Sequence, residues 1–250
     1  MNRLGALWRF EVLRLIRSWK FLVITTGFPV IFYMLFLSDD KASRVVAGTV
    51  PWRVYLMVSM CSFGALVAGL TAGGARLSAE RASGWSRQLR VTPVPAWSYV
   101  ATKVSASMIV ILPVLILVEV VGVTFGGVHE SLGRLTELTA LLWVGTLPFA
   151  FLGVLIGFVV STEAAFPVVT GLMFVLGYFG GLFNPVGSMP QALQVSARLL
   201  PSFHLDALGL AVLDGRGFGA VHWVVLIGYA AVLGLVVVAR QRVDASRGAA

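Results

Sequence analysis

The chain has 250 residues, of which 58% are hydrophobic and only 12% are charged. A soluble domain carries about 25% charged residues, so this composition excludes an ordinary soluble protein and favours one embedded in a membrane. The formal net charge of +8 would suggest a nucleic-acid partner in a soluble chain, but here the basic residues flank long apolar runs, which argues against that partner.

The first twenty residues are predicted to form an amphipathic helix. At 100° per residue, Trp8 and Trp19 share one face with aliphatic residues. The opposite face carries Arg9, Arg14 and Arg17. This pattern is typical of a helix in the membrane plane, with tryptophan at the interface and cations toward the lipid headgroups. We favour this interfacial helix over one packed on a soluble partner, because it runs directly into the first apolar run.

Six apolar runs of about the length of a membrane span follow. Crossing a hydrocarbon core of about 30 Å takes roughly 20 helical residues. Together the runs account for about half the chain, so we predict an all-α integral membrane protein with one transmembrane domain and no separate soluble domain. The predicted spans lie near residues 21–37, 54–75, 104–125, 138–160, 165–183 and 221–239.

Lysine and arginine residues are distributed unequally between the two sides of these spans. Thirteen lie on the side of both termini and six on the other. Because the side richer in lysine and arginine is cytoplasmic in multi-pass proteins, we expect both termini to be inside. An even number of spans independently requires the two termini to lie on one side.

Small residues and prolines recur within the predicted spans. Gly-x-x-x-Gly spacings place two glycines on one helix face, which lets helix backbones approach closely in lipid. Prolines are expected to start or kink helices. The glycine pairs are Gly69 with Gly73, Gly122 with Gly126, Gly153 with Gly157 and Gly177 with Gly181, and the prolines are Pro29, Pro113, Pro148 and Pro167.

A charged segment at residues 80–103 separates the second and third spans. We predict a cytoplasmic helix over 78–92 that ends at Thr92 and Pro93, because proline restricts the residue before it and cannot continue a helix. Polar residues are rare in this chain, so their concentration indicates contact with water or a partner. The pattern alone leaves two interpretations open, docking to a soluble partner and a solvated basic helix that faces lipid.

The stretch 184–220, between the fifth and sixth spans, is predicted to lie on the outer side. Ser188, with Gln191 three residues later, matches a capping box that would begin a helix of about ten residues. Pro201 would begin a second helix, ending near Leu213. Both are too short to cross the membrane, which favours two re-entrant helices over a plain extracellular cap. As candidates for an outer gate we single out Phe183, Pro185, Met189 and Pro190.

Motifs for catalysis are nearly absent from the sequence. The chain has no G-x-x-x-x-G-K-[ST] loop and no nucleophile elbow, and its three histidines match no metal signature. We therefore expect no catalytic residues and no metal site. Cys61 is the only cysteine and is expected to pack as a small core residue.

Glu119 is the one ionisable residue well inside a predicted span. Carboxylates within membranes are costly, which makes Glu119 a candidate for the substrate path, where it would meet a cationic substrate or move a proton. Two alternatives stay open, a protonated acid hydrogen-bonded to a neighbouring helix and a side chain wetted at the outer interface.

Several of these segments together resemble type-2 ABC exporter permeases of the bacterial drug-resistance kind. The order of an amphipathic N-terminal helix and six spans is similar, so the resemblance covers nearly the whole chain. The matching segments are Glu80-Arg81-x-x-Gly84-x-x-x-x-Leu89-Arg90-x-Thr92-Pro93, ahead of Lys103, and Gly180-Gly181-x-Phe183-x-Pro185-x-x-x-Met189-Pro190 after the fifth span.

The resemblance implies a coupling helix around residues 81–90 that sits in a groove of a separate ABC ATPase. Gly84, Trp85 and Leu89 would pack inside this groove. ATP and Mg²⁺ would bind to the ATPase and not to this chain. Two permease copies, or this chain and a sibling, would pair in the bacterial plasma membrane and export an amphiphilic drug, natural product or lipid-like molecule. Charged contacts at the rim would come from Glu80, Arg81, Arg87 and Arg90.

Two other functions remain as hypotheses. A secondary transporter or channel that works without an ATPase would depend on Glu119 and on the broken outer helices. A membrane scaffold or lipid-handling enzyme is the third hypothesis, and it has no catalytic set to support it.

Overall fold

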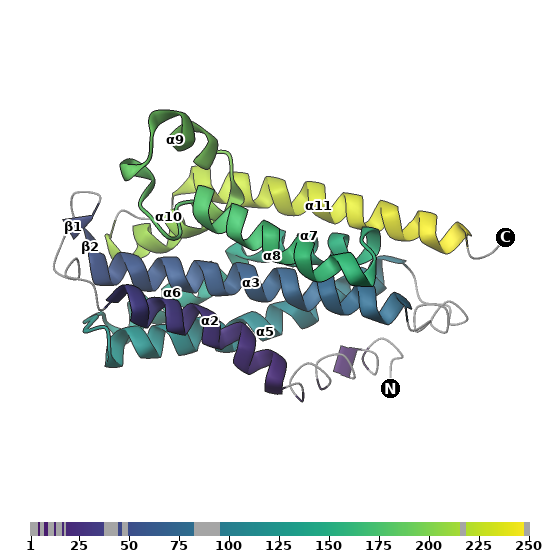
Figure 1. Ribbon diagram of the computed structural model, residues 1–250, viewed down its shortest axis with the longest axis horizontal. Coiled ribbons are helices and arrows are strands. Elements are labelled where there is room, and N and C mark those ends of the chain that lie inside the picture. The colour runs from purple at the N-terminus through teal and green to yellow at the C-terminus, as the bar shows by residue number, and fades with distance from the viewer. Residues whose placement is uncertain are drawn as a thin grey trace.

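The computed structural model describes residues 5, 8–9, 13, 17, 19–37, 45–46, 50–82, 96–215 and 219–247. Long helices run side by side and form a bundle, with shorter elements at one end (Figure 1). The helices of the bundle are α2 (Trp19–Leu37), α3 (Trp52–Ala82), α5 (Ala96–Thr124), α6 (Leu132–Gly145), α7 (Leu147–Val159), α8 (Thr162–Phe179) and α11 (Ala220–Arg247). The elements gathered at one end are an antiparallel ribbon of β1 (Val45–Val46) and β2 (Val50–Pro51), the 3₁₀ turn η2 (Val186–Ser188), α9 (Gln191–Ala197) and α10 (Pro201–Leu213).

Five helical stretches among the described residues are long and apolar enough to cross a membrane. They coincide with the second to sixth predicted spans, and so confirm a helical membrane protein. The first predicted span corresponds to α2, whose apolar part Val23–Leu37 is shorter than the other five, so a sixth crossing stays a prediction. The five stretches are Trp52–Ala82, Trp97–Thr124, Leu132–Val159, Thr162–Phe179 and Ala220–Arg242.

The fourth of the predicted spans consists of two consecutive helices. α6 begins after Ser131, whose hydroxyl accepts a hydrogen bond from the backbone N–H of Arg134 and thereby caps the helix. α7 begins at Leu147 with Pro148 in its first turn, where the missing N–H of proline leaves no hydrogen bond unmade. Pro148 therefore starts a helix, which was one of the two roles predicted for it.

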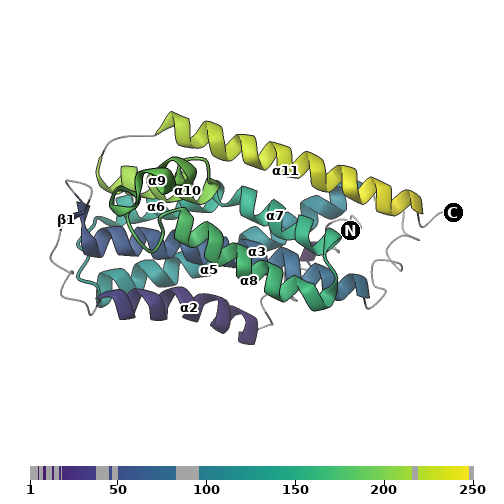
Figure 2. The same cartoon turned by 45° about the horizontal axis from the view of Figure 1, so that its top comes forward.

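The two ends of the bundle contain different elements. The β1–β2 ribbon, α9 and α10 gather at one end, which we call the outer end (Figures 1 and 2). The C-terminal ends of α3 and α11 lie at the opposite end, which we call the inner end. This separation agrees with the sides expected from the lysine and arginine distribution. The cytoplasmic location of the inner end stays a prediction.

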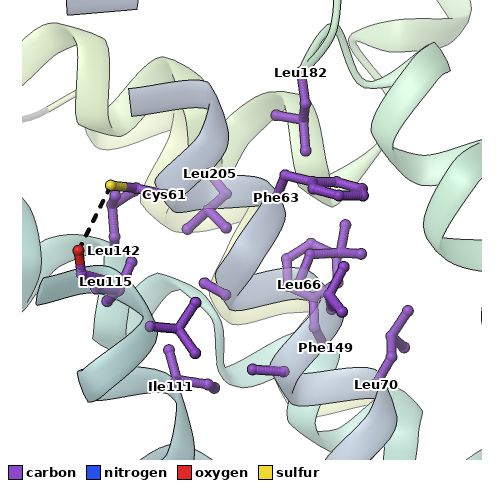
Figure 3. Packing of buried hydrophobic residues seen from close by; sticks show 14 of the residues in the cluster. Cys61, Phe63, Leu66, Leu70, Ile111, Leu115, Leu142, Phe149, Leu182 and Leu205 are labelled. Carbon is purple, nitrogen blue, oxygen red and sulfur yellow. Dashed lines mark hydrogen bonds between the residues drawn. The ribbon is translucent and has the colours of Figure 1, made fainter. Parts of the chain in front are cut away.

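Helix α3 lies at the centre of the bundle and contacts α2, α5, α7, α8 and α10. Every residue from 55 to 70 is buried, as expected for a helix that is apolar on all sides and surrounded by other helices. Phe63 and Phe149 belong to this core (Figure 3). Cys61 is buried beside them, with its sulfur 3.9 Å from the Leu115 carbonyl oxygen. Cys61 is thus a core residue, as predicted.

Two of the predicted glycine pairs face each other where α3 packs on α7. A Cβ atom on Gly73 would lie 2.6 Å from the backbone nitrogen of Val154. A Cβ atom on Gly153 would lie 2.5 Å from the carbonyl oxygen of Gly69, and one on Gly157 would lie 2.8 Å from that of Gly73. Only glycine permits such a close backbone approach, which confirms the packing role predicted for these two pairs.

The outer helices match the sequence prediction at one boundary and differ at another. α10 spans Pro201–Leu213, as expected, and Gly215 follows it with a φ of 70°. The capping box predicted at Ser188 is wrong, because α9 begins only after Pro190. The Ser188 hydroxyl donates instead to the Pro185 carbonyl oxygen (2.7 Å) within the preceding turn, so it does not cap a helix.

Candidate functional site

At the inner end, a buried ion pair joins α3 to α5. The Lys103 ammonium group donates to a Glu80 carboxylate oxygen at 2.5 Å, and the two residues are 7% and 4% exposed. The Tyr99 ring centroid lies 5.5 Å from the same ammonium nitrogen and adds a cation–π contact. Because residues 83–95 connect these two helices, the ion pair holds the two ends of the connecting segment together.

Arg81 ties the same end of α3 to α7. Its guanidinium group donates to the backbone carbonyl oxygens of Gly157 (3.1 Å) and Phe158, in the last turn of α7. Carbonyl groups at a helix C-terminus lack partners within the helix and carry the negative end of its dipole, so this contact stabilises the helix end. The Thr162 hydroxyl of α8 also donates to the Ser78 carbonyl oxygen (3.0 Å). Four helices therefore meet beside the predicted coupling segment.

The structure changes the boundary of the predicted cytoplasmic helix. Residues 78–82 are the last residues of α3, because no helix-breaking residue interrupts the sequence there. Glu80 and Arg81 consequently have partners within the bundle, which was not expected for side chains at the rim of a separate helix. Their contact with an ATPase stays a prediction. The other predicted interface residues lie outside the described part of the chain: Gly84, Trp85, Arg87, Leu89, Arg90, Thr92 and Pro93.

Part of the predicted interfacial helix lies against α5. The Trp8 indole N–H donates to the Ser105 hydroxyl (3.1 Å), while the Trp8 side chain stays partly exposed. Ser105 is two residues beyond the lysine of the buried ion pair, so this contact reaches the same inner junction. Among the other interfacial candidates, Trp19 begins α2, Arg9 and Arg17 are described, and Arg14 lies outside the described residues.

Glu119 lies beside a groove between α5 and α6. Glu119 is 6% exposed, and both of its carboxylate oxygens accept from the Thr139 hydroxyl at 2.8 Å. The groove has a volume of about 560 Å³, and its walls include the exposed side chains of Ile116 and Val120. The hydrogen bond to a neighbouring helix agrees with part of one alternative left open, and the protonation that this alternative also assumed stays a prediction. Glu119 also borders an apolar groove on the side surface of the bundle.

The four predicted outer-gate residues lie in different surroundings. Phe183 packs against Phe63 of the core, with ring centroids 4.9 Å apart. Pro185 lines a cavity at the outer end. Met189 and Pro190 directly precede α9, with Pro190 at its N-cap position. Their combined role as a gate stays a prediction.

A buried carboxyl group at the outer end escaped sequence-based prediction. Asp206 of α10 is 5% exposed and lines a cavity of about 450 Å³. Its Oδ1 atom has no hydrogen-bond partner among the described residues. Burial raises the pKa of Asp206 to about 7, and the nearby hydroxyls of Ser59 and Ser62 offset part of this shift. The available signal was an acidic residue in an otherwise apolar short helix.

Two histidines, 18 residues apart, link α10 to α11. The Nδ1 atoms of His204 and His222 lie 2.8 Å apart, and the His204 Nε2 atom lies 2.8 Å from the Arg198 carbonyl oxygen. A carbonyl only accepts, so His204 donates from Nε2, and in a neutral His204 the Nδ1 atom then accepts the Nδ1–H of His222. Within the described residues, no group of three or more His, Cys, Asp or Glu side chains could hold a metal ion.

Comparison with known proteins gives two matches. Residues 39–239 match the family described as ABC-2 family transporter protein. The chain is also similar to YvfS of Bacillus subtilis (strain 168), a protein named as a transport permease. The two sequences are 28% identical over 206 residues, which cover 79% of this chain and 80% of the relative. The family match includes the inner ion pair, the Glu119 groove and the cavity at Asp206.

Proposed function

The chain belongs to the ABC-2 family of transporter proteins, and on this basis we propose that it is the membrane-spanning permease subunit of an ATP-driven exporter. A separate ABC ATPase would bind ATP and Mg²⁺ and supply the energy. One observation carries the proposal beyond the family match, namely the inner junction. There the Glu80–Lys103 pair and Arg81 join α3, α5 and α7 beside the segment that an ATPase would contact.

The inner junction would transmit a movement of the coupling segment to three helices at once. Helix α3 has 31 residues, which corresponds to a length of about 46 Å at 1.5 Å per residue. Its glycines hold its backbone against that of α7, so the two helices would move as a unit. A displacement at the inner end would therefore reach Tyr55 and the outer cavity at the other end of α3.

The coupling segment would dock in a groove of the ATPase. Gly84, Trp85 and Leu89 would pack inside the groove, and Arg87 and Arg90 would make charged contacts at its rim. Thr92 and Pro93 would end the helix. The support for this assignment is the sequence motif itself, together with the position of the segment between the two helices that the buried ion pair joins.

We expect Arg90→Glu and Gly84→Trp to reduce export by about tenfold or more, because the first replaces attraction by repulsion and the second overfills the groove. Both variants should keep normal levels of the chain in the membrane. Efflux of the substrate from intact cells measures the effect. Arg242→Glu is the matched control, because Arg242 is an exposed arginine near the inner end of α11. Full export by either loop variant would contradict the proposed interface.

An amphiphilic substrate fits the apolar groove with its single carboxyl group. A drug, natural product or lipid-like molecule would leave the cytoplasm or the inner leaflet. Much of α8 and α11 is not covered by the rest of the chain, which leaves apolar surface for lipid and for a second permease copy or sibling. The complex would lie in a bacterial plasma membrane with both termini in the cytoplasm.

A secondary transporter or channel independent of an ATPase is the second candidate, and the buried carboxyl group of Glu119 is the observation that favours it. Such a transporter would couple movement of its substrate to an ion gradient through this group. Export that continues without any ATPase and stops when the proton gradient is dissipated would favour this second candidate.

Glu119→Gln separates a functional carboxylate from a structural one. The amide keeps the shape and the contact with Thr139 but removes the charge, so export of a cationic dye such as ethidium should fall about tenfold with unchanged membrane levels. Glu137→Gln is the control, since Glu137 is exposed on α6. Equal export by Glu119→Gln and the wild type would remove Glu119 from the substrate path.

A further inference from the structure

The cavity at the outer end has features that docking of an ATPase does not explain. It has a volume of about 450 Å³ and lies among the N-terminal end of α3, the turn after α8, α9 and α10. Tyr55 and Phe203 supply aromatic walls, and Asp206 supplies an acidic group. The Tyr55 hydroxyl donates to the Gly181 carbonyl oxygen, which fixes the ring against a turn that lines the cavity.

Asp206 is unusual because it is both buried and incompletely paired. It is 5% exposed, and its Oδ1 atom lacks a hydrogen-bond partner among the described residues. The Ser59 and Ser62 hydroxyls lie near this carboxyl group, but they leave its Oδ1 atom unpaired, and an unpaired polar atom in a buried site is costly. A ligand that donates hydrogen bonds and carries a positive charge would remove this cost.

An ammonium group fits these requirements better than a neutral or anionic group. It offers three donors and no acceptor, which complements a carboxylate. Aromatic rings also attract cations, and two of them line the cavity. Arg198 lines the cavity as well, but its side chain is exposed, where water and salt screen its charge.

We propose that this outer cavity binds the protonated amine of an amphiphilic molecule, with Asp206 as the acidic partner of the ammonium group. The cavity walls other than Asp206 would contact part of the apolar portion of the amphiphilic molecule. The site would be on the release side of the exporter, at the end of α3 opposite the inner junction. The substrate class is thereby narrowed to amphiphilic amines. Binding of an amine to this cavity does not depend on the proposed function. The assignment of the cavity to the release side of an exporter, and of the amine as its substrate, rests on that function.

Binding of three dansyl probes to the purified full-length chain tests the charge requirement. The chain is placed in phosphatidylcholine nanodiscs, and empty nanodiscs give the lipid background. Dansylcadaverine carries a primary amine, dansylamide is uncharged, and dansylglycine carries a carboxylate. We expect only dansylcadaverine to show saturable fluorescence enhancement. Asp206→Asn should weaken its binding about tenfold to a hundredfold, the loss expected for a hydrogen bond to a charged group.

Glu130→Gln is the matched control, because it removes an outer-end carboxylate that pairs with Arg134 at 3.2 Å on the surface. This variant should bind dansylcadaverine as the wild type does. Equal binding by Asp206→Asn and the wild type, or preferential binding of dansylglycine, would overturn the proposal.

Cysteine protection locates the probe without altering Asp206. Ala207 lines the cavity, and the native Cys61 is fully buried, so Ala207→Cys offers an accessible thiol within the site. Dansylcadaverine should slow maleimide labelling of Ala207→Cys and leave labelling of the exposed Ser131→Cys unchanged. Unprotected Ala207→Cys at saturating probe would place the binding elsewhere and contradict the proposal. Neither assay contains an ATPase, so their failure is distinct from a failure of the proposed exporter function.

Discussion

Glu80→Gln is expected to destabilise the protein by about 3–5 kcal/mol and to abolish export. The variant leaves the Lys103 ammonium group buried beside α3 without its carboxylate, and an uncompensated buried charge is strongly unfavourable. The junction between α3 and α5 would loosen at the point where the coupling segment begins and ends. The midpoint of thermal aggregation in detergent measures the loss of stability, and efflux from cells measures the loss of function.

A double-mutant cycle separates the ion pair from the effect of each side chain. Lys103→Met alone should also be destabilising, whereas Glu80→Gln combined with Lys103→Met should cost much less than the sum of the single changes. The pair of Glu130 and Arg134 provides the comparison, because its arginine is exposed and its glutamate is only half-buried, and Arg134→Gln there should change stability by less than about 1 kcal/mol. If the losses of stability in the Glu80 and Lys103 cycle are additive, the two residues act independently, and the proposed junction is contradicted.

Gly73→Ala is expected to destabilise the protein by about 1–3 kcal/mol or more, although alanine is the better helix former. The added methyl group would meet the backbone nitrogen of Val154 at 2.6 Å, and a backbone atom cannot turn aside as a flexible side chain can. The α3–α7 contact would have to widen. The thermal aggregation midpoint and the yield of monodisperse protein measure the effect.

Gly228→Ala provides the opposite result for the same chemical change. Gly228 lies within α11, and apart from its chain neighbours and the nearby backbone of its own helix, a Cβ atom there would have no described atom within 4 Å. Alanine should therefore be neutral or stabilise the helix by up to about 1 kcal/mol. Equal midpoints for Gly73→Ala and Gly228→Ala would show that the α3–α7 backbones are not in the close contact described.

Local signals predicted several elements of the fold well. Apolar runs of the right length predicted the long helices, since their composition is a local property of the sequence. Pro148 and Pro201 each stand in the first turn of a helix, because proline has a preset backbone angle and needs no hydrogen-bond partner there. The capping box predicted at Ser188 was wrong for an equally local reason. Its hydroxyl could cap a following helix or bond within the preceding turn, and it donates to the Pro185 carbonyl oxygen in that turn.

Contacts between distant segments could not be predicted in the same way. The spacing of Gly69 and Gly73 identified a face of α3, but spacing carries no information on which helix meets that face. Glu80 and Lys103 pair only because α3 continues to Ala82 and α5 begins at Ala96. Neither boundary follows from the hydropathy of the spans. The apolar run of α3 stops several residues before the helix ends, and that of α5 starts several residues after the helix begins.

The candidate site was predicted unevenly for a related reason. Glu119 was found because an acidic residue within a long apolar run stands out, and the structure added its bond to Thr139 and the adjoining groove. Asp206 lies in a short helix that we expected to be re-entrant, and its spacing from His204 matched no motif, so nothing local singled out its carboxyl group. Its burial depends on packing against Ser59 of α3, which is far away in the sequence.

The most direct test of the central claim is copurification of the tagged chain from its native membrane in a gentle detergent. We predict that a soluble ABC ATPase accompanies the chain in stoichiometric amount, and that Arg90→Glu removes it while Arg242→Glu does not. Absence of any ATPase, in a preparation that keeps another membrane complex intact, would contradict the assignment as an ATP-driven permease subunit.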